Sequence, residues 1–241
     1  ESLLLPVVTD ILMKLPDDVK YDGTNVIKPA VNTTVKAALS RRFRDVKVSD
    51  FRSETDEVKE IQFAAVTFTL PDDTLFVAFR GTDNSIVGWK EDFNMSFQSS
   101  VPAQQLALQY VQEFAAAHPI PIWMGGHSKG GNLAVFAAAR SSPWIQERIA
   151  AVYNNDGPGF TQYLMGDPGY LAMVPKIRTY VPQSSVIGML LEHEEPYTVI
   201  RSKSVGLLQH DLYTWDVLGR SFIPMEEITK NGGKILKQQV E

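Results

Sequence analysis

The chain has 241 residues, of which 44% are apolar, 21% charged and 10% aromatic. Proteins of this composition fold around a buried core, so a disordered tail, a collagen and a linker protein are excluded. The formal net charge of −5 provides no global basic field, and nucleic acid is therefore not an expected partner. The chain contains no cysteine, which excludes a thiol nucleophile, disulfides and thiolate metal sites.

No apolar run approaches the ~18 residues that a membrane span needs, and no secretory signal pattern opens the chain. We therefore expect no integral membrane segment and a cytoplasmic location. Residue 1 is Glu rather than Met, so we expect a trimmed N-terminus. The motifs described below are scattered along most of the chain, which predicts one α/β domain over residues 1–241. Within it we expect an N-terminal helical extension over 1–50 and a C-terminal helix over 224–241.

The first third of the chain is expected to contain two helices and a hairpin. Apolar periodicity predicts helices at Leu3 to Leu15 and Val31 to Phe43. The charged stretch Ser53 to Glu60 is expected to be a solvated loop or the start of a helix. Two β-rich runs, Phe63 to Leu70 and Leu75 to Phe79, predict a hairpin because a proline-containing turn sequence separates them.

The remainder of the chain alternates strands with helices. Helices are predicted at Ala103 to Ala117 and Lys129 to Arg140, and a further helix is expected to begin at Pro224. Strands are predicted at Ile120 to Met124, Ile149 to Asn154, Lys176 to Val181 and Tyr197 to Ser202. This alternation favours the α/β fold class, with a mostly parallel sheet and helices on both faces.

The sequence Gly126-His127-Ser128-Lys129-Gly130 matches G-x-S-x-G and lies between a predicted strand and a predicted helix. That context is typical of the nucleophile elbow of α/β hydrolases, in which a strained turn exposes the serine hydroxyl. The glycines leave room for the turn, and the following helix directs its N-terminal N–H groups towards the hydroxyl. The pattern predicts Ser128 as a nucleophile for acyl transfer. A glycine-rich turn with an incidental serine is the alternative.

A serine nucleophile needs a base, and the chain has four histidines: His118, His127, His193 and His210. His127 is expected to point away from the nucleophile that it adjoins, and His118 precedes the strand that leads into the elbow. In α/β hydrolases the chain order is serine, acid, histidine, so the base should follow the last strands. His210 does so and is the predicted base, with His193 as the alternative.

The segment Phe79-Arg80-Gly81-Thr82 ends an early strand where the hydrolase fold supplies its second oxyanion donor. We expect the backbone N–H of Thr82 to act there together with the backbone N–H of Lys129. A plain Gly-Thr turn is the alternative.

Four parts of the sequence then occur together in a definite order. They are FRGTDNSIVGWKEDF (79–93), GGHSKGGNLAV (125–135), NNDGPGF (154–160), and the pair VPQSSVIGMLLEH and LLQHDLYTW (181–193 and 207–215). In order and spacing they resemble the bacterial Mbeg1-like proteins, relatives of the class 3 lipases, over roughly residues 40 to 225. The resemblance implies an α/β-hydrolase fold, a nucleophile at Ser128, a base at His210 and oxyanion stabilisation around Thr82.

One position departs from the lipase pattern. The triad acid of class 3 lipases corresponds to Ser185, which carries no carboxylate. Asp156 is the preferred acid, because it follows a predicted strand at the carboxyl edge of the sheet. The alternatives are an Asx-turn role for Asp156, a dyad without an acid, or a glutamate after the next strand. The glutamates in question are Glu192, Glu194 and Glu195.

Trp89 and Phe93 lie in the apolar stretch after the oxyanion loop and are predicted to line a lid or an acyl-binding wall, or else to be packed core. Lys129 stands where class 3 lipases have an apolar residue, and its cation is expected to favour an anionic substrate group or to form a salt bridge. Together these features predict a serine hydrolase that cleaves small ester or lipid-like substrates, with no metal and no cofactor. An amidase, thioesterase or acyltransferase would use the same machinery, and a non-catalytic binding protein on this fold is the further alternative.

Overall fold

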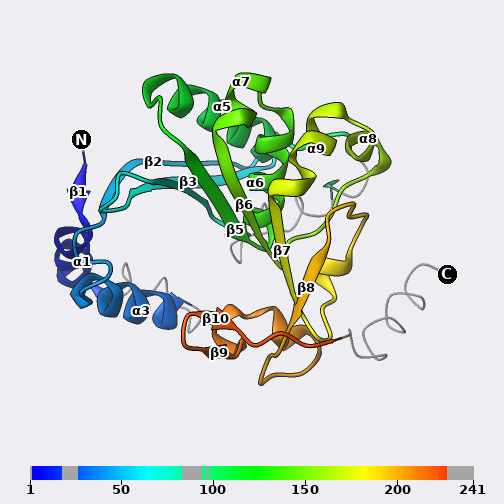
Figure 1. Ribbon diagram of the computed structural model, residues 1–241. Coiled ribbons are helices and arrows are strands. Elements are labelled where there is room, and N and C mark those ends of the chain that lie inside the picture. The colour runs from blue at the N-terminus through cyan, green and yellow to red at the C-terminus, as the bar shows by residue number, and fades with distance from the viewer. Residues whose placement is uncertain (1, 18–26, 83–93, 96–97, 227–241) are drawn as a thin grey trace.

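The computed structural model describes residues 2–17, 27–82, 94–95 and 98–226, and its centre is an eight-stranded sheet whose strands follow the chain order β1 to β8 (Figure 1). The strands are β1 (Leu3–Leu4), β2 (Lys47–Asp56), β3 (Ile61–Thr69), β4 (Leu75–Phe79), β5 (Ile122–His127), β6 (Ile149–Asn155), β7 (Ile177–Pro182) and β8 (Tyr197–Ile200). Strands β1 to β4 pair antiparallel, and β4 to β8 pair parallel. The parallel strands therefore end at one shared edge, which is where α/β sheets bind ligands.

Helices cover both faces of this sheet. They are α1 (Leu5–Lys14), α3 (Ile27–Leu39), α5 (Pro102–Ala117), α6 (Lys129–Arg140), α7 (Pro143–Arg148), α8 (Gln162–Met165) and α9 (Pro168–Met173). Figure 1 shows α5, α6 and α9 grouped on one side of the sheet, and α1 and α3 on the other. The predicted α/β-hydrolase architecture, a parallel sheet between helices, is confirmed.

Two separate cores follow from the alternation of side chains along β3. Phe63 and Ala65 point to the α5 and α6 face and join the main core, whereas Phe68 points to the opposite face. There Phe68 packs on the small core formed by Leu5, Ala38 and Val46. The two faces of one strand thus hold the main body and the N-terminal helices together.

Most of the predicted elements are confirmed, with bounds that shift by about one helical turn or less. The hairpin is among them, since β3 and β4 pair antiparallel from Ala65 opposite Phe79 to Thr69 opposite Leu75. No helix in the described part of the chain has the length and apolar composition needed to cross a bilayer.

The expectation of a loop or helix start at Ser53 to Glu60 is wrong for residues 53–56, which belong to β2, whereas residues 57–60 form a turn. Strand β1 has only two residues, so most of β2 forms an edge with solvent on its outer side. Its side chains are exposed or half-buried along its whole length, and charged residues are tolerated on such a strand.

The expected helix start at Pro224 is also wrong. Pro224 forms an isolated antiparallel bridge with Ile200 of β8. Before it, the chain makes a short hairpin from β9 (Val217–Leu218) and β10 (Ser221–Phe222). The rest of the predicted C-terminal helix, residues 227–241, lies outside the described residues.

Candidate active site

Ser128 is the single residue between the end of β5 at His127 and the start of α6 at Lys129. Its φ of 56° and ψ of −133° form a conformation that non-glycine residues rarely adopt. The strained residue is held at both ends: its N–H donates to the carbonyl of Asn155 over 3.0 Å, and its carbonyl accepts from Gly131 over 2.9 Å. This strand, strained serine and helix have the geometry of a nucleophile elbow.

The two glycines of the G-x-S-x-G pattern are required by close backbone packing. A Cβ on Gly126 would lie 2.4 Å from the carbonyl carbon of Gly130, and a Cβ on Gly130 would lie 2.3 Å from the carbonyl oxygen of Phe79. The loop after β4 approaches as closely, since a Cβ on Gly81 would lie 2.7 Å from the carbonyl oxygen of His127 and 3.4 Å from Cβ of Ser128. The segment that carries Thr82 therefore lies directly against the elbow.

Asp156 and His210 form a direct pair. Asp156 follows β6 with a φ of 54°, is 1% exposed, and donates its N–H to the carbonyl of Tyr180 over 2.8 Å. Its Oδ2 lies 2.7 Å from Nδ1 of His210, a residue at the end of the 3₁₀ turn Gly206–His210. Because a carboxylate oxygen accepts, Nδ1 carries the proton, and Nε2 is left as the basic nitrogen of the ring.

Ser185 binds the same carboxylate, a role that was not predicted from the sequence. Its hydroxyl donates to Oδ1 of Asp156 over 2.5 Å and accepts the N–H of Gly188 over 3.0 Å. A Cβ on Gly188 would lie 2.3 Å from the same Oδ1. Position 185, where the resemblance to class 3 lipases places the acid, thus carries a hydroxyl. That hydroxyl donates to Asp156, which follows the neighbouring strand. The only signal in the sequence was the serine itself.

Two of the alternatives for the acid, the Asx turn and Glu195, are accounted for by other contacts. The Asx turn after β6 is made by Asn154, whose Oδ1 accepts the N–H of Gly157 over 3.0 Å. Glu195 is buried and accepts from Tyr170 and Thr179, and its Oε1 lies 3.0 Å from Nδ1 of His193. His193 therefore pairs with a carboxylate other than Asp156.

His127 lies against the predicted base. The ring centroids of His127 and His210 are 4.4 Å apart, and Nε2 of His127 donates to the backbone carbonyl of His210 over 2.7 Å. Burial lowers the pKa of His127 to about 4, and the neighbouring His210 adds to the shift. At neutral pH His127 is accordingly an uncharged donor that fastens the backbone of His210.

The segment around His210 is fastened by further hydrogen bonds of Gln209. The buried Gln209 side chain accepts the N–H of Ser184 over 2.8 Å and donates to the carbonyl of Ser204 over 2.7 Å. Nε1 of Trp215 donates to the carbonyl of Gln209 over 2.7 Å. These bonds hold the turn against the end of β7.

The side chain of Lys129 points into the molecule. It is 1% exposed, and its Nζ donates to the backbone carbonyl and to Oε1 of Gln62, over 2.8 and 2.6 Å. The expectation that this cation favours an anionic substrate group is therefore wrong. The backbone N–H of Lys129 stays in the first turn of α6, beside Ser128. Trp89 and Phe93 lie outside the described residues.

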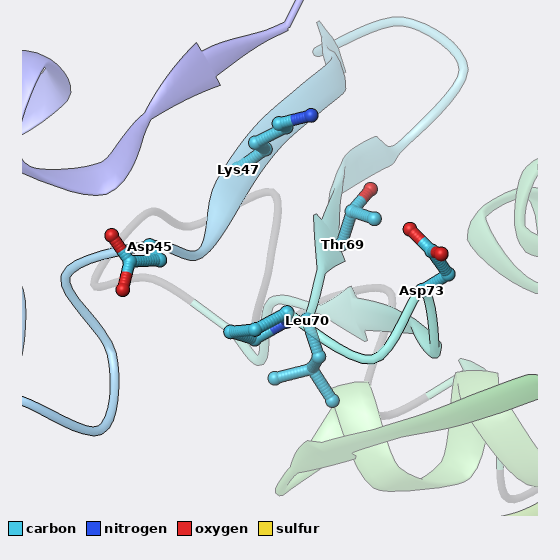
Figure 2. A pocket seen from close by; sticks show the side chains of 6 residues that line it. Asp45, Lys47, Thr69, Leu70 and Asp73 are labelled. Atoms are coloured by element: carbon cyan, nitrogen blue, oxygen red, sulfur yellow. The ribbon is translucent and has the colours of Figure 1, made fainter.

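A hollow of about 250 Å³ lies far from these groups (Figure 2). It opens where β2 begins and β3 turns into β4, at the end of β4 opposite the elbow. Its lining consists of Asp45, Lys47, Thr69, Leu70, Pro71 and Asp73. Among the residues that the structure describes, no three histidine or carboxylate side chains gather closely enough to hold a metal ion.

Comparisons with known proteins identify the family of the chain. Residues 37–241 match the sequence profile of the Mbeg1-like family. No curated protein matches the chain.

Solved structures with a similar fold include three lipases. A Rhizomucor miehei lipase propeptide complex has a TM-score of 0.47 and 17% identity, over 65% of this chain and 57% of that one. The M37 lipase has a TM-score of 0.43 and 14% identity, over 69% and 64%. A triacylglycerol lipase from Penicillium expansum has a TM-score of 0.44 and 13% identity, over 78% of each chain. The chain thus spans less than two thirds of the first two of these structures.

The depressed pKa of His127 predicts an acid-dependent loss of stability. Between about pH 6.5 and pH 4 the unfolded chain binds a proton at this position and the folded chain does not, so the free energy of unfolding falls as the pH falls. We expect the wild type to lose ~1–3 kcal/mol more over this range than His127→Asn, in urea denaturation at several pH values. Equal slopes for the two proteins would contradict the assignment of a neutral, buried His127.

Proposed function

The chain belongs to the Mbeg1-like family, and from this premise we propose that it is a serine hydrolase that cleaves carboxylic esters through an acyl-enzyme. The observation that carries the proposal is the 2.7 Å contact of the buried Asp156 with Nδ1 of His210, at the edge where Ser128 occupies its strained turn. A buried acid on Nδ1 leaves Nε2 free to accept a proton, which is the task of a general base.

The register of the parallel strands supports a common site for these groups. His127 of β5 pairs with Asn155 of β6, and Ser128 and Asp156 are the next residues on their strands. The ring of His210 lies against His127, the residue before Ser128. An acid, a base and a nucleophile on one sheet edge match the roles that acyl transfer needs.

In the proposed mechanism Ser128 Oγ attacks the ester carbonyl carbon while Nε2 of His210 accepts the hydroxyl proton. Asp156 stabilises the imidazolium that results. The backbone N–H groups of Thr82 and Lys129 hold the oxyanion of the tetrahedral intermediate, and one such donor typically contributes ~3 kcal/mol to transition-state stabilisation. His210 then protonates the departing alcohol, and a water molecule, activated by the same imidazole, hydrolyses the acyl-enzyme.

In the sequence, the absence of a carboxylate at position 185 favours a non-catalytic protein. Asp156, which follows β6, weakens this argument because it supplies a carboxylate to His210. Asp156 meets two donors, Nδ1–H of His210 and the hydroxyl of Ser185, as a buried carboxylate requires. Ester cleavage is the proposed reaction, and a panel of matched ester, thioester and amide substrates distinguishes it from the related acyl transfers.

A fluorophosphonate probe tests the nucleophile. We expect the wild-type protein to be labelled on the peptide that contains Ser128, because a serine beside a general base is activated towards such electrophiles. Ser128→Ala should lose the label, as measured by intact mass and peptide mapping. Absence of labelling in folded wild-type protein would count against the proposal.

Removal of the acid or the base should lower activity far more than removal of His193, the other histidine that pairs with a buried carboxylate. We expect His210→Ala and Asp156→Asn each to lower kcat/KM by about 10⁴, since the remaining groups no longer hold a basic Nε2 next to Ser128. His193→Ala is the matched control, because His193 also pairs with a buried carboxylate, and it should keep most of the activity. If His193→Ala were the inactive variant, the base would be misassigned.

Ser185 is expected to act as a positioning residue through Asp156. A hydrogen bond to a charged group contributes about 1.5–3 kcal/mol, so Ser185→Ala should lower kcat roughly 10- to 100-fold and leave KM nearly unchanged. Ser185→Thr, which keeps the hydroxyl, should restore part of the loss and serves as the control for the bond itself. Equal activity of Ser185→Ala and wild type would show that Asp156 needs no such support.

A further inference from the structure

Helix α1 has two apolar sides, and only one of them is packed. Leu5 and the alkyl part of Thr9 are buried against α3 and the start of β2. The opposite side carries a line of exposed side chains at intervals of three or four residues, here called the α1 stripe: Leu4 (42% exposed), Val7 (42%), Ile11 (51%) and Leu15 (38%). This spacing places Val7 and Ile11 on one face of the helix, and Leu4 of β1 and Leu15 after the last helical residue continue the line beyond its two ends, over a length of ~16 Å.

The α1 stripe is presented by a fixed element. The N–H of Leu5 donates to the carbonyl of Val46 over 2.8 Å, and β1 pairs with β2 through Leu4 opposite Lys47. The helix is therefore attached to the edge of the sheet, with its stripe outward. Single exposed apolar residues are ordinary, but a continuous apolar surface of this kind marks a binding surface.

Three arginines adjoin this helix. Arg41, Arg42 and Arg44, here called the basic cluster, follow α3, which packs against α1. Arg42 lies 5.1 Å from the ring centroid of Phe43, and Phe43 packs on the small core that includes Leu5. The cluster is thus held close to α1 by a shared core.

The basic cluster is exposed and largely uncompensated. Within the described residues Arg41 and Arg42 have no carboxylate partner, and Arg44 meets only its neighbour Asp45 over 3.5 Å, a surface pair of little energetic weight. The other exposed charges of α1, the end of α3 and the start of β2 are Lys14, Lys36 and Lys47 against Asp10, Asp17 and Asp45. Among these described residues six cationic side chains therefore lie with three anionic ones in the elements around the α1 stripe, in a chain whose net charge is −5.

We propose that the α1 stripe and the basic cluster form a docking surface for a bilayer that contains anionic phospholipids. The stripe would lie at the boundary of headgroups and acyl chains, and the guanidinium groups would bind lipid phosphates. A ten-residue helix is ~15 Å long and the hydrocarbon core is ~30 Å thick, so α1 lies in the plane of the interface and does not span it.

The charge around the stripe favours a bilayer over a second copy of the chain. A two-fold dimer places the same patch on both sides of its interface, so two net positive regions would face each other. An anionic lipid surface presents the complementary charge. The hollow in Figure 2 adjoins this region, but Asp45 and Asp73 line it and would repel a phosphate, so the arginines carry the contact.

This surface is separate from the candidate active site. Strand β1 is four strands from β5 in the sheet, a distance of about 19 Å at the usual strand spacing. Figure 1 shows α1 at the opposite side of the sheet from β7 and β8. Helix α1 also precedes residues 37–241, which match the family. Docking would localise the protein without occupying the site, and the inference does not depend on the proposed hydrolase activity.

Vesicle co-sedimentation of the purified chain tests the inference. We expect binding to vesicles of phosphatidylcholine with about 30% phosphatidylglycerol, weaker binding at high salt, and little binding to phosphatidylcholine alone. Ile11→Asp should lower the partition coefficient at least ~10-fold, because it puts a charge into the stripe. Arg41→Glu with Arg42→Glu should abolish the preference for anionic vesicles. Leu171→Asp on α9 is the matched control, since Leu171 is also 51% exposed, and it should bind as the wild type does.

Thermal melting of each variant provides the control for folding, and Ile11 tolerates substitution because it is half exposed. Wild-type protein that binds neither vesicle, or an Ile11→Asp variant that binds as well as wild type, would overturn the inference. A concentration-dependent dimer in sedimentation velocity that Ile11→Asp abolishes would assign the stripe to a second copy of the chain instead. Fluorophosphonate labelling of Ser128 is unaffected by any of these outcomes, so docking and hydrolysis are tested separately.

Discussion

The close crossing of backbone at the end of β5 is the constraint on which the rest of the site depends. The first turn of α6 and the end of β4 approach so closely that Gly126 and Gly130 have no room for a Cβ. Because of that approach, the chain turns from strand to helix within one residue, Ser128. The same packing holds the strained backbone of this residue. It also brings the loop with Gly81 and Thr82 against the elbow. One packing constraint therefore sets both the exposure of the hydroxyl and the position of the proposed oxyanion donors.

The contact of Asp156 with His210 illustrates how a parallel sheet can bring a carboxylate to a histidine from more than one strand. Neighbouring parallel strands end at the same edge, so a carboxylate after β6 reaches the histidine as directly as one after β7 would. At the end of β7 the hydroxyl of Ser185 satisfies the second oxygen of Asp156, and the absence of a side chain at Gly188 leaves space for that oxygen. The carboxylate–histidine contact thus forms from the end of β6, whereas the resemblance to class 3 lipases implies an acid after β7.

Two surfaces of different character lie at opposite sides of the sheet. The candidate active site is built from buried polar groups that satisfy each other, including His127, which fastens the segment of the base while it stays uncharged. The α1 stripe and basic cluster are exposed, and within the described part of the chain the three arginines meet a single carboxylate, Asp45 beside Arg44. Their chemistry fits recognition of a lipid surface, and their separation from the site allows attachment and catalysis to proceed independently.

The sequence by itself determined the features that depend on local chemistry. Glycine spacing located the elbow at Ser128, and a proline-containing turn located the β3–β4 hairpin. Chain order selected His210 and a place directly after a predicted strand selected Asp156, and the structure brings these two residues into contact. The tertiary structure alone decided the rest, because those features depend on contacts between residues distant along the chain. The hydroxyl of Ser185 reaches an acid on another strand, and the Lys129 cation is buried against Gln62 of β3. The charged segment after Ser53 becomes a strand because pairing with β3 satisfies its backbone while its side chains remain at an open edge.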